Sequence, residues 1–208
     1  MPVRTQKTSS WSDMLEGLKY VAGHRAIRML IFNLGMLSML GLGMITLFPA
    51  WSVNILKGDA TTNGLLISAR GLGSLGSAIL IASLGRFNFR GKLLTYGCFA
   101  FPVMMIIFSQ MRQLSLSLLT VVGVGLGFML VANLTNALVQ TLVPDPLRGR
   151  VMGVYTLIFF GAMPVGSLLA GTLASWLGEP VTIILSASAL LLFVLLVYIF
   201  FPTMRKLE

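Results

Sequence analysis

Long apolar runs separated by short polar stretches dominate the chain after its first 28 residues. A bilayer core of about 30 Å requires about 20 apolar residues in a helix that rises 1.5 Å per residue. By this measure the sequence predicts six membrane-spanning helices, at Met29–Trp51, Gly64–Leu84, Leu93–Ser109, Leu116–Gln140, Val151–Leu177 and Val181–Phe201. The runs are continuously apolar, whereas the strands of a membrane barrel alternate apolar and polar residues. We therefore predict an all-α membrane protein.

The segment before the first run predicts a short amphipathic helix. Apolar side chains recur at helical spacing at Trp11, Leu15, Leu18 and Ala22. The opposite side is charged, as in helices that lie on a membrane surface. A plain cytosolic linker helix is the alternative interpretation. The predicted organisation is an N-terminal cytoplasmic segment at 1–28, a transmembrane domain at 29–201 and a cytoplasmic tail at 202–208.

Most Lys and Arg residues lie on one side of the membrane in the predicted topology. Twelve of the fifteen lie in the N-terminal segment, the second-to-third loop, the fourth-to-fifth loop and the tail. The alternate loops hold only Lys57 and Arg112. Because cytoplasmic loops are enriched in Lys and Arg, this pattern predicts that both termini are cytoplasmic. The net charge of +9 is spread over these segments rather than gathered in one patch, which argues against nucleic-acid binding.

The composition agrees with a chain that is solvated by lipid. Hydrophobic residues make up 56% of the chain and charged residues 10%, and the mean hydropathy is +0.91. Soluble domains contain about 25% charged residues. The single cysteine, Cys98, lies in an apolar run and is interpreted as a small packing residue. No metal site and no cofactor are predicted.

A weak repeat relates the second and fifth predicted spans. The segments GLGSLGS and GAMPVGS match at an offset of 90 residues, at Gly71 and Gly161, Gly76 and Gly166, and Ser77 and Ser167. In the predicted topology these two spans run in opposite directions, which indicates a 3+3 inverted repeat. The alternative is that Gly and Ser serve close helix packing without any repeat. We select Gly71, Gly76, Pro164 and Gly166 as packing or kink positions; a bend at Pro164 would serve either motion or helix shape.

Two segments resemble a known family. VPDPLRGRVMGVYTLIFFGAMPVGSLLAG, residues 143–171, and DMLEGLKYVAGHRAIRMLI, residues 13–31, are similar to major facilitator superfamily (MFS) exporters, nearest the proton-driven drug and siderophore exporters of bacteria. The resemblance implies the C-terminal half of a twelve-helix transporter in the bacterial inner membrane. It also implies proton antiport coupled to efflux of small, largely apolar molecules by alternating access. The implied partner is an N-terminal six-helix half or a second copy.

Basic residues in two predicted cytoplasmic loops are candidates for gating or anchoring. Arg86 and Arg90, in SLGRFNFRGKLL, match the basic part of the family's gating loop, but no Asp stands beside them. Arg148 and Arg150 belong to the segment that carries the resemblance. Ordinary positive-inside anchoring is the alternative for all four.

The predicted spans lack the residue types that usually relay protons. All six acidic residues and His24 lie outside the spans. A proton relay needs such groups at depth, so the coupling carboxylate is expected in the partner half. The same absence argues against an intramembrane metalloenzyme or serine protease, and no enzymatic activity is predicted. Arg70 is the single charge within the spans, and it would bind an anionic substrate group or an acid of the partner half, or anchor the outer end of its helix.

Amide side chains are the remaining candidates for a substrate cavity. Asn133, Asn136 and Gln140 form a stripe at i, i+3 and i+7 on the fourth span, and Asn33 lies on its counterpart, the first span. These amides would line a wetted cavity or hydrogen-bond neighbouring helices. Together with Arg70 they are the predicted cavity residues.

The absence of acids at depth leaves alternatives to a transporter half. One is a six-helix membrane module without transport, or an inactive fragment of a split or truncated transporter gene. Another is a homodimer of the six-helix chain that functions without the missing carboxylate.

Overall fold

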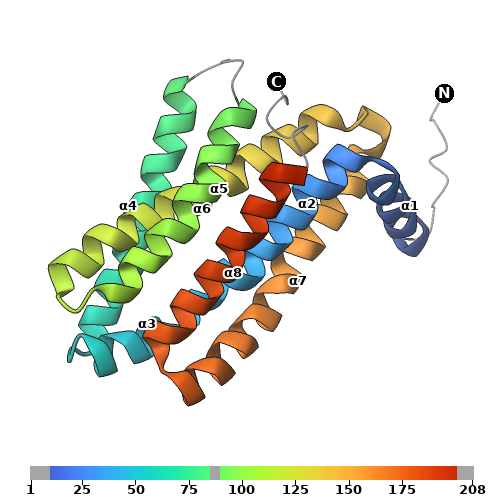
Figure 1. The fold of residues 1–208 in the computed structure, drawn as a ribbon. Helices are drawn as coiled ribbons and strands as arrows, with labels where there is room; N and C mark the ends of the chain where they lie inside the picture. The colour runs from blue at the N-terminus through green and yellow to red at the C-terminus, as the bar shows by residue number, and fades with distance from the viewer. Residues whose placement is uncertain (1–9, 85–89, 201–208) are drawn as a thin grey trace.

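The computed structural model describes residues 10–84 and 90–200, and these ranges are helical with no strands. Six helical segments in them are long and apolar enough to cross a bilayer, which confirms the predicted number of spans. The elements are α1 (Ser10–Gly23), a first span from α2 (Arg25–Leu37) to η3 (Trp51–Ile55), α4 (Ala60–Leu84), α5 (Arg90–Gln110), α6 (Leu114–Leu142), α7 (Asp145–Leu177) and α8 (Glu179–Phe200). Figure 1 shows the spans as one bundle, with α1 beside it.

The helices extend beyond the apolar runs, as the start of α4 shows. This helix begins at Ala60, four residues before the predicted start of the span. The Asp59 carboxylate accepts a hydrogen bond from the Thr62 backbone N–H at 3.1 Å, and the Thr62 hydroxyl accepts one from the Asp59 N–H at 3.3 Å. This reciprocal capping satisfies N–H groups that the first helical turn leaves unpaired. Hydropathy alone misses the first turn because capping residues are polar.

The Asp59 cap predicts a pH-dependent contribution to stability. The Thr62 N–H lowers the pKa of Asp59 below its ordinary value of 3.8. A carboxyl with a lowered folded-state pKa stabilises the fold above the unfolded pKa, and this stabilisation is lost as the pH falls through the folded pKa. We therefore expect Asp59→Ala to lower the thermal unfolding midpoint at pH 7, and to lower it less in strong acid, where the protonated carboxyl is a weaker acceptor. Asp59→Asn, which keeps a neutral acceptor, should retain most of the wild-type midpoint at both pH values.

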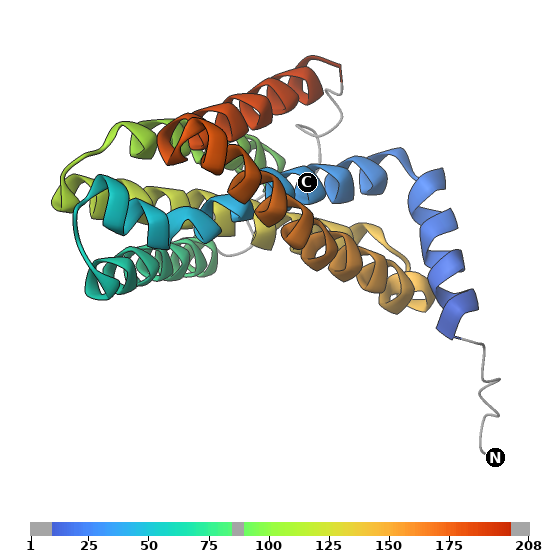
Figure 2. The same ribbon diagram turned by 90° about the horizontal axis from the view of Figure 1, so that it is seen from below.

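Helix α1 lies across one end of the bundle, transverse to the long helices (Figure 2). Its buried face contains Gly17 and Val21, and the ideal Cβ of a residue at Gly17 would lie 2.7 Å from the backbone oxygen of Arg150 on α7. The apolar residues of the predicted stripe are exposed, Trp11 by 65% and Leu15 by 51%. The stripe therefore faces away from the protein, which leaves it free to contact a membrane surface. The cytoplasmic location of α1 stays a prediction.

The first span is irregular over its second half. After α2 it continues as a π-helical segment, Ser38–Leu42 (η1), a 3₁₀ segment, Gly43–Leu47 (η2), a short α-helical piece, Phe48–Ala50 (α3), and a second π-helical segment in η3. Pro49 has no N–H to continue the helical bonds. Two hydroxyls of this segment hydrogen-bond to its backbone carbonyls: Thr46 donates to Gly43 O at 2.5 Å and Ser52 to Pro49 O at 2.8 Å. The apolar run predicted a single span at Met29–Trp51 and did not indicate these changes of helix type.

The two triplets of spans exchange their middle helices. Helix α4, the middle span of the first triplet, packs on α6, the first span of the second triplet. Helix α7, the middle span of the second triplet, packs on η1 and η2 of the first span. This reciprocal exchange is the arrangement expected of the 3+3 inverted repeat of an MFS half.

Aromatic side chains fill the core between the triplets. Phe101 of α5 is 1% exposed, and its ring lies 5.7 Å from that of Phe128 on α6. At the opposite end from α1, Trp51 and Phe108 have ring centroids 4.6 Å apart. The guanidinium of Arg112 lies 5.6 Å over the Trp51 ring, a cation–π contact that covers this end of the core.

Candidate functional site

Glycines bring backbones into contact where the triplets cross. At the crossing of α4 and α6, a Cβ at Gly73 would lie 1.9 Å from Val122 O, and one at Gly125 would lie 2.1 Å from Arg70 O. No real Cβ tolerates such distances, so only glycine fits. The predicted positions on α4 are less crowded. A Cβ added at Gly71 would have no packing neighbour within 4 Å, and one at Gly76 would lie 3.8 Å from a methyl carbon of Leu126. The structure thus places the close approach at Gly73.

The crossing of α7 with the first span repeats this contact. A Cβ at Gly166 would lie 1.8 Å from Met39 O, and one at Gly43 would lie 2.7 Å from Gly166 O. The hydroxyl of Ser38 donates to the carbonyl of Phe159 on α7 at 2.5 Å. The irregular segments η1 and η2 are therefore held against α7 by backbone contacts. Pro164 lies exposed just before Gly166, within a helix that continues to Leu177.

Arg70 lies near the middle of α4. Since α4 starts at Ala60, Arg70 is ten residues from its beginning, about 15 Å along the axis. Its side chain is half-buried beside a small cavity that Met44, Phe101 and Phe128 also line. Its Nε atom is buried and has no hydrogen-bond partner among the described residues. Among the described residues no ion pair involves its guanidinium, which lies close to the aromatic core.

The amide stripe of α6 lies two turns away from Arg70. The carbonyl of Arg70 faces Gly125, eight residues or about 12 Å before Asn133 along α6. Asn133 and Asn136 are half-buried, and Gln140 donates from Nε2 to Asn136 Oδ1 at 2.6 Å. The structure therefore brings two of the amides together but separates them from Arg70.

Asn33 occupies a different environment from the α6 amides. It is 2% exposed, and its Nδ2 donates to Cys98 Sγ at 3.3 Å. This contact joins α2 to α5, and it is a packing interaction. Sequence reasoning treated Asn33 and Cys98 separately because they lie 65 residues apart.

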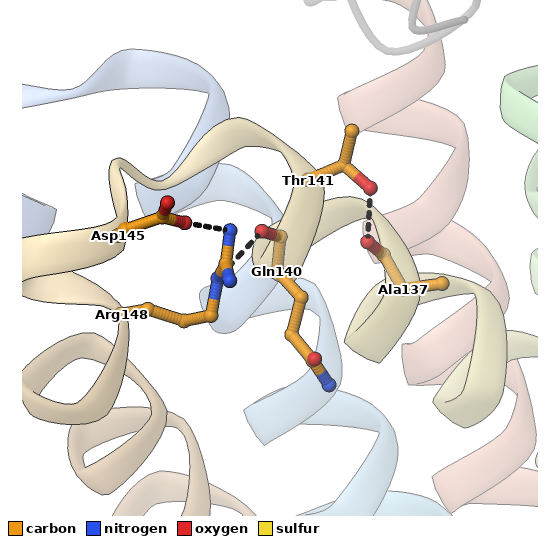
Figure 3. Close-up of polar contacts among 5 residues, drawn as sticks. All are labelled: Ala137, Gln140, Thr141, Asp145 and Arg148. Carbon is orange, nitrogen blue, oxygen red and sulfur yellow. Dashed lines mark hydrogen bonds and ion pairs between the residues drawn. The ribbon is translucent and has the colours of Figure 1, made fainter.

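Arg148 joins the end of α6 to the start of α7. Figure 3 shows its guanidinium between the Asp145 carboxylate and the backbone carbonyl of Gln140. The Nη2–Asp145 Oδ1 distance is 2.6 Å, and Nε donates to Gln140 O at 3.2 Å. A cation bound to one of the last carbonyls of α6 also complements the negative end of that helix. Arg148 thus closes the α6–α7 turn.

Arg150 connects α7 to the transverse helix α1. Its Nη2 lies 2.8 Å from Asp13 Oδ1, and its Nη1 lies 2.8 Å from Glu16 Oε1. Both carboxylates lie one turn apart on α1, so a single guanidinium bridges them. Of the other two basic candidates, Arg90 is the first residue of α5 and Arg86 lies outside the described residues.

The acidic residues in the described part of the chain lie on α1 or at the starts of the spanning helices. Asp13 and Glu16 lie on α1, Asp59 precedes α4, and Asp145 and Glu179 begin α7 and α8. Within residues 10–84 and 90–200 no three His, Cys, Asp or Glu side chains come together as a metal site. The described residues therefore offer one charge at depth, that of Arg70, and polar amides on α6.

Comparison with known proteins supplies the family. The family model for transmembrane secretion effectors matches residues 7–208. The multidrug efflux pump Tap of Mycolicibacterium fortuitum is 29% identical over 203 residues, which are 95% of this chain and 48% of that pump. The pumps of the same name from Mycobacterium tuberculosis (strain ATCC 25618 / H37Rv) and Mycobacterium bovis (strain BCG / Pasteur 1173P2) are 30% identical over 95% of this chain and 46% of their own length.

The chain thus spans about half the length of these relatives. The six spans, the exchanged triplets and the match over nearly the whole sequence agree with one another and confirm the resemblance carried by residues 143–171. The chain belongs to the transmembrane secretion effector family of the major facilitator superfamily.

Proposed function

We propose that the chain acts as the C-terminal six-helix half of a transporter that exports small, largely apolar molecules by alternating access. The observation that carries this proposal is the match of 95% of the chain to proteins named multidrug efflux pumps. The chain is oriented with both termini in the cytoplasm of a bacterial cell, because twelve of its fifteen Lys and Arg residues lie on that side.

The irregular first span supports alternating access. Rocking of one helix group against another requires an element that changes shape without losing its packing. The segments η1 and η2 interrupt regular α-helical bonding where the first span crosses Gly166 of α7. Interrupted helices at such crossings are a recurrent feature of transporters. The first span would bend there while α7 remains one helix.

A six-helix partner would complete the substrate path and supply the coupling acid. Apolar side chains on α4 and α7 are exposed, including Leu72 by 63% and Leu168 by 73%. Some of this surface would face lipid and some a second six-helix unit. Arg70, without a partner on its Nε, would pair there with an acid of that unit or with an anionic substrate group.

Reconstitution tests this function directly. The chain alone, and the chain co-expressed with the N-terminal half of the Mycolicibacterium fortuitum relative, would be placed in proteoliposomes with an imposed proton gradient. We expect gradient-dependent movement of ethidium only for the pair, because no Asp, Glu or His side chain lies at depth among the described residues. Equal movement by the chain alone would instead indicate that a second copy of the chain takes the place of the N-terminal half. No movement in either sample, with both halves correctly inserted, would contradict the proposal.

The same assay tests the role of Arg70. Arg70→Ala is expected to lower transport about ten-fold, equivalent to ~1.4 kcal/mol of lost interaction. Arg70→Lys, which keeps the charge, should retain a substantial part of the rate. Unchanged transport by Arg70→Ala would remove Arg70 from the site.

A further inference from the structure

A groove of about 460 Å³ lies between α5 and α8, on a part of the bundle that the proposed mechanism does not use. Its described lining residues are Lys92, Thr95, Tyr96, Phe99 and Tyr198. The first four occupy the beginning of α5, and Tyr198 lies near the end of α8. The two helices pack against each other and run in opposite directions, so these residues meet at one end of the bundle (Figure 1). The volume is within the range of about 300–1,000 Å³ found for ligand-binding clefts.

The groove combines one cation with amphipathic aromatic rings. Lys92 is exposed, and no described lining residue is acidic. Tyr96 is 71% exposed, and the rings of Phe99 and Tyr198 make an edge contact with centroids 5.5 Å apart. Tyrosines of this kind are enriched where a membrane protein crosses the headgroup region. The lining therefore presents an apolar floor with a positive charge at one edge.

The surroundings of the groove indicate a lipid rather than a soluble anion. Helix α8 is the most apolar span, with a mean hydropathy of 2.8, and only 28% of its most apolar window is buried inside the protein. Its outer face continues with the exposed residues Leu192, Leu195 and Leu196. Leu195 lies one turn before Tyr198 on the same face of α8, so an acyl chain packed against Leu195 would lie beside the groove. Basic pockets between spans at the cytoplasmic end of a membrane protein bind anionic headgroups.

We propose that this groove binds an anionic phospholipid of the cytoplasmic leaflet, with its phosphate at Lys92 and the upper part of an acyl chain against Phe99 and Tyr198. The assignment to the cytoplasmic leaflet rests on the proposed orientation of the chain. The ammonium of Lys92 neutralises the phosphate, and the rings of Tyr96 and Tyr198 flank the glycerol region.

Native mass spectrometry of the purified full chain in detergent tests this proposal. Phosphatidylglycerol and phosphatidylcholine with the same acyl chains would be titrated separately. We expect a preference of the wild type for phosphatidylglycerol and a loss of about five-fold in its apparent affinity in Lys92→Ala, the effect of about one membrane-proximal cation. Lys92→Arg should restore the affinity. Lys57→Ala, which removes an exposed lysine after the first span, is the matched control and should leave the affinity unchanged.

Three results would overturn the proposal. They are equal binding of the two lipids, equal losses in Lys92→Ala and Lys57→Ala, and unchanged binding in Lys92→Ala. Binding in detergent does not depend on how the chain is inserted or on transport, so a negative result here leaves the proposed export function intact. A failure of reconstituted export likewise leaves the lipid groove intact.

Discussion

Gly73→Ala is expected to destabilise the bundle, whereas Gly71→Ala, two residues away on the same helix, should not. The added methyl at position 73 would lie 1.9 Å from Val122 O, so α4 and α6 would have to separate. Overpacking of this kind costs about 1–3 kcal/mol. A methyl added at position 71 would have no packing neighbour within 4 Å, and alanine favours the helix more than glycine does.

The single cysteine provides the measurement. Cys98 is free and buried, so a thiol-reactive dye reports unfolding of the wild type and of both variants during heating in detergent. A shift of 1 kcal/mol moves the midpoint of a soluble domain of this size by about 2–4 °C. We expect a midpoint several degrees lower for Gly73→Ala alone. Equal midpoints for the two variants would show that the α4–α6 crossing accommodates a side chain, contrary to the structure.

Arg150→Ala is expected to release α1 from the bundle. The substitution removes the cation between Asp13 and Glu16 and leaves two half-exposed carboxylates near each other. Hydrogen bonds to charged groups contribute about 1.5–3 kcal/mol and exposed ion pairs contribute less. We therefore expect the docking of α1 to lose ~1.4 kcal/mol of free energy. Amides of Ser10–Gly23 should then exchange hydrogen about ten-fold faster, while those of α7 remain protected.

Arg148→Ala is the matched control for this experiment. Arg148 contacts Asp145 and Gln140, both at the α6–α7 turn, and no described contact joins it to α1. Its replacement should leave exchange in α1 unchanged. If the two variants accelerate α1 equally, the docking of α1 depends on the general charge of this end rather than on the Arg150 bridge.

The number of spans could be predicted from the sequence because lipid imposes a length and a polarity on every crossing helix. The starts of the helices could not, since caps such as Asp59 with Thr62 are polar and lie outside the apolar runs. The irregular geometry of Ser38–Ile55 was also missed. Gly41, Gly43 and Pro49 permit such geometry, but the backbone of α7 at Gly166 holds it in place.

The sequence offered candidate residue types for the site, but it did not supply their contacts. The segment GLGSLGS contains several glycines, and only the rotation of α4 against α6 decides that Gly73, rather than Gly71, meets Val122. Arg150 was expected to gate or anchor, but its bridge to Asp13 spans 137 residues of sequence. Periodicity describes one helix at a time, so contacts between distant helices were not available from it.

The exchange of middle helices also constrains the order in which the chain can be assembled. Helix α4 packs on α6 and α7 packs on the first span, so each triplet contains a helix whose main partner belongs to the other triplet. During synthesis, α4 and α5 enter the membrane before α6 exists. The glycine and aromatic faces of α4 and α5 therefore contact lipid until α6 has been synthesised and inserted. The bundle can close only once α7 has followed.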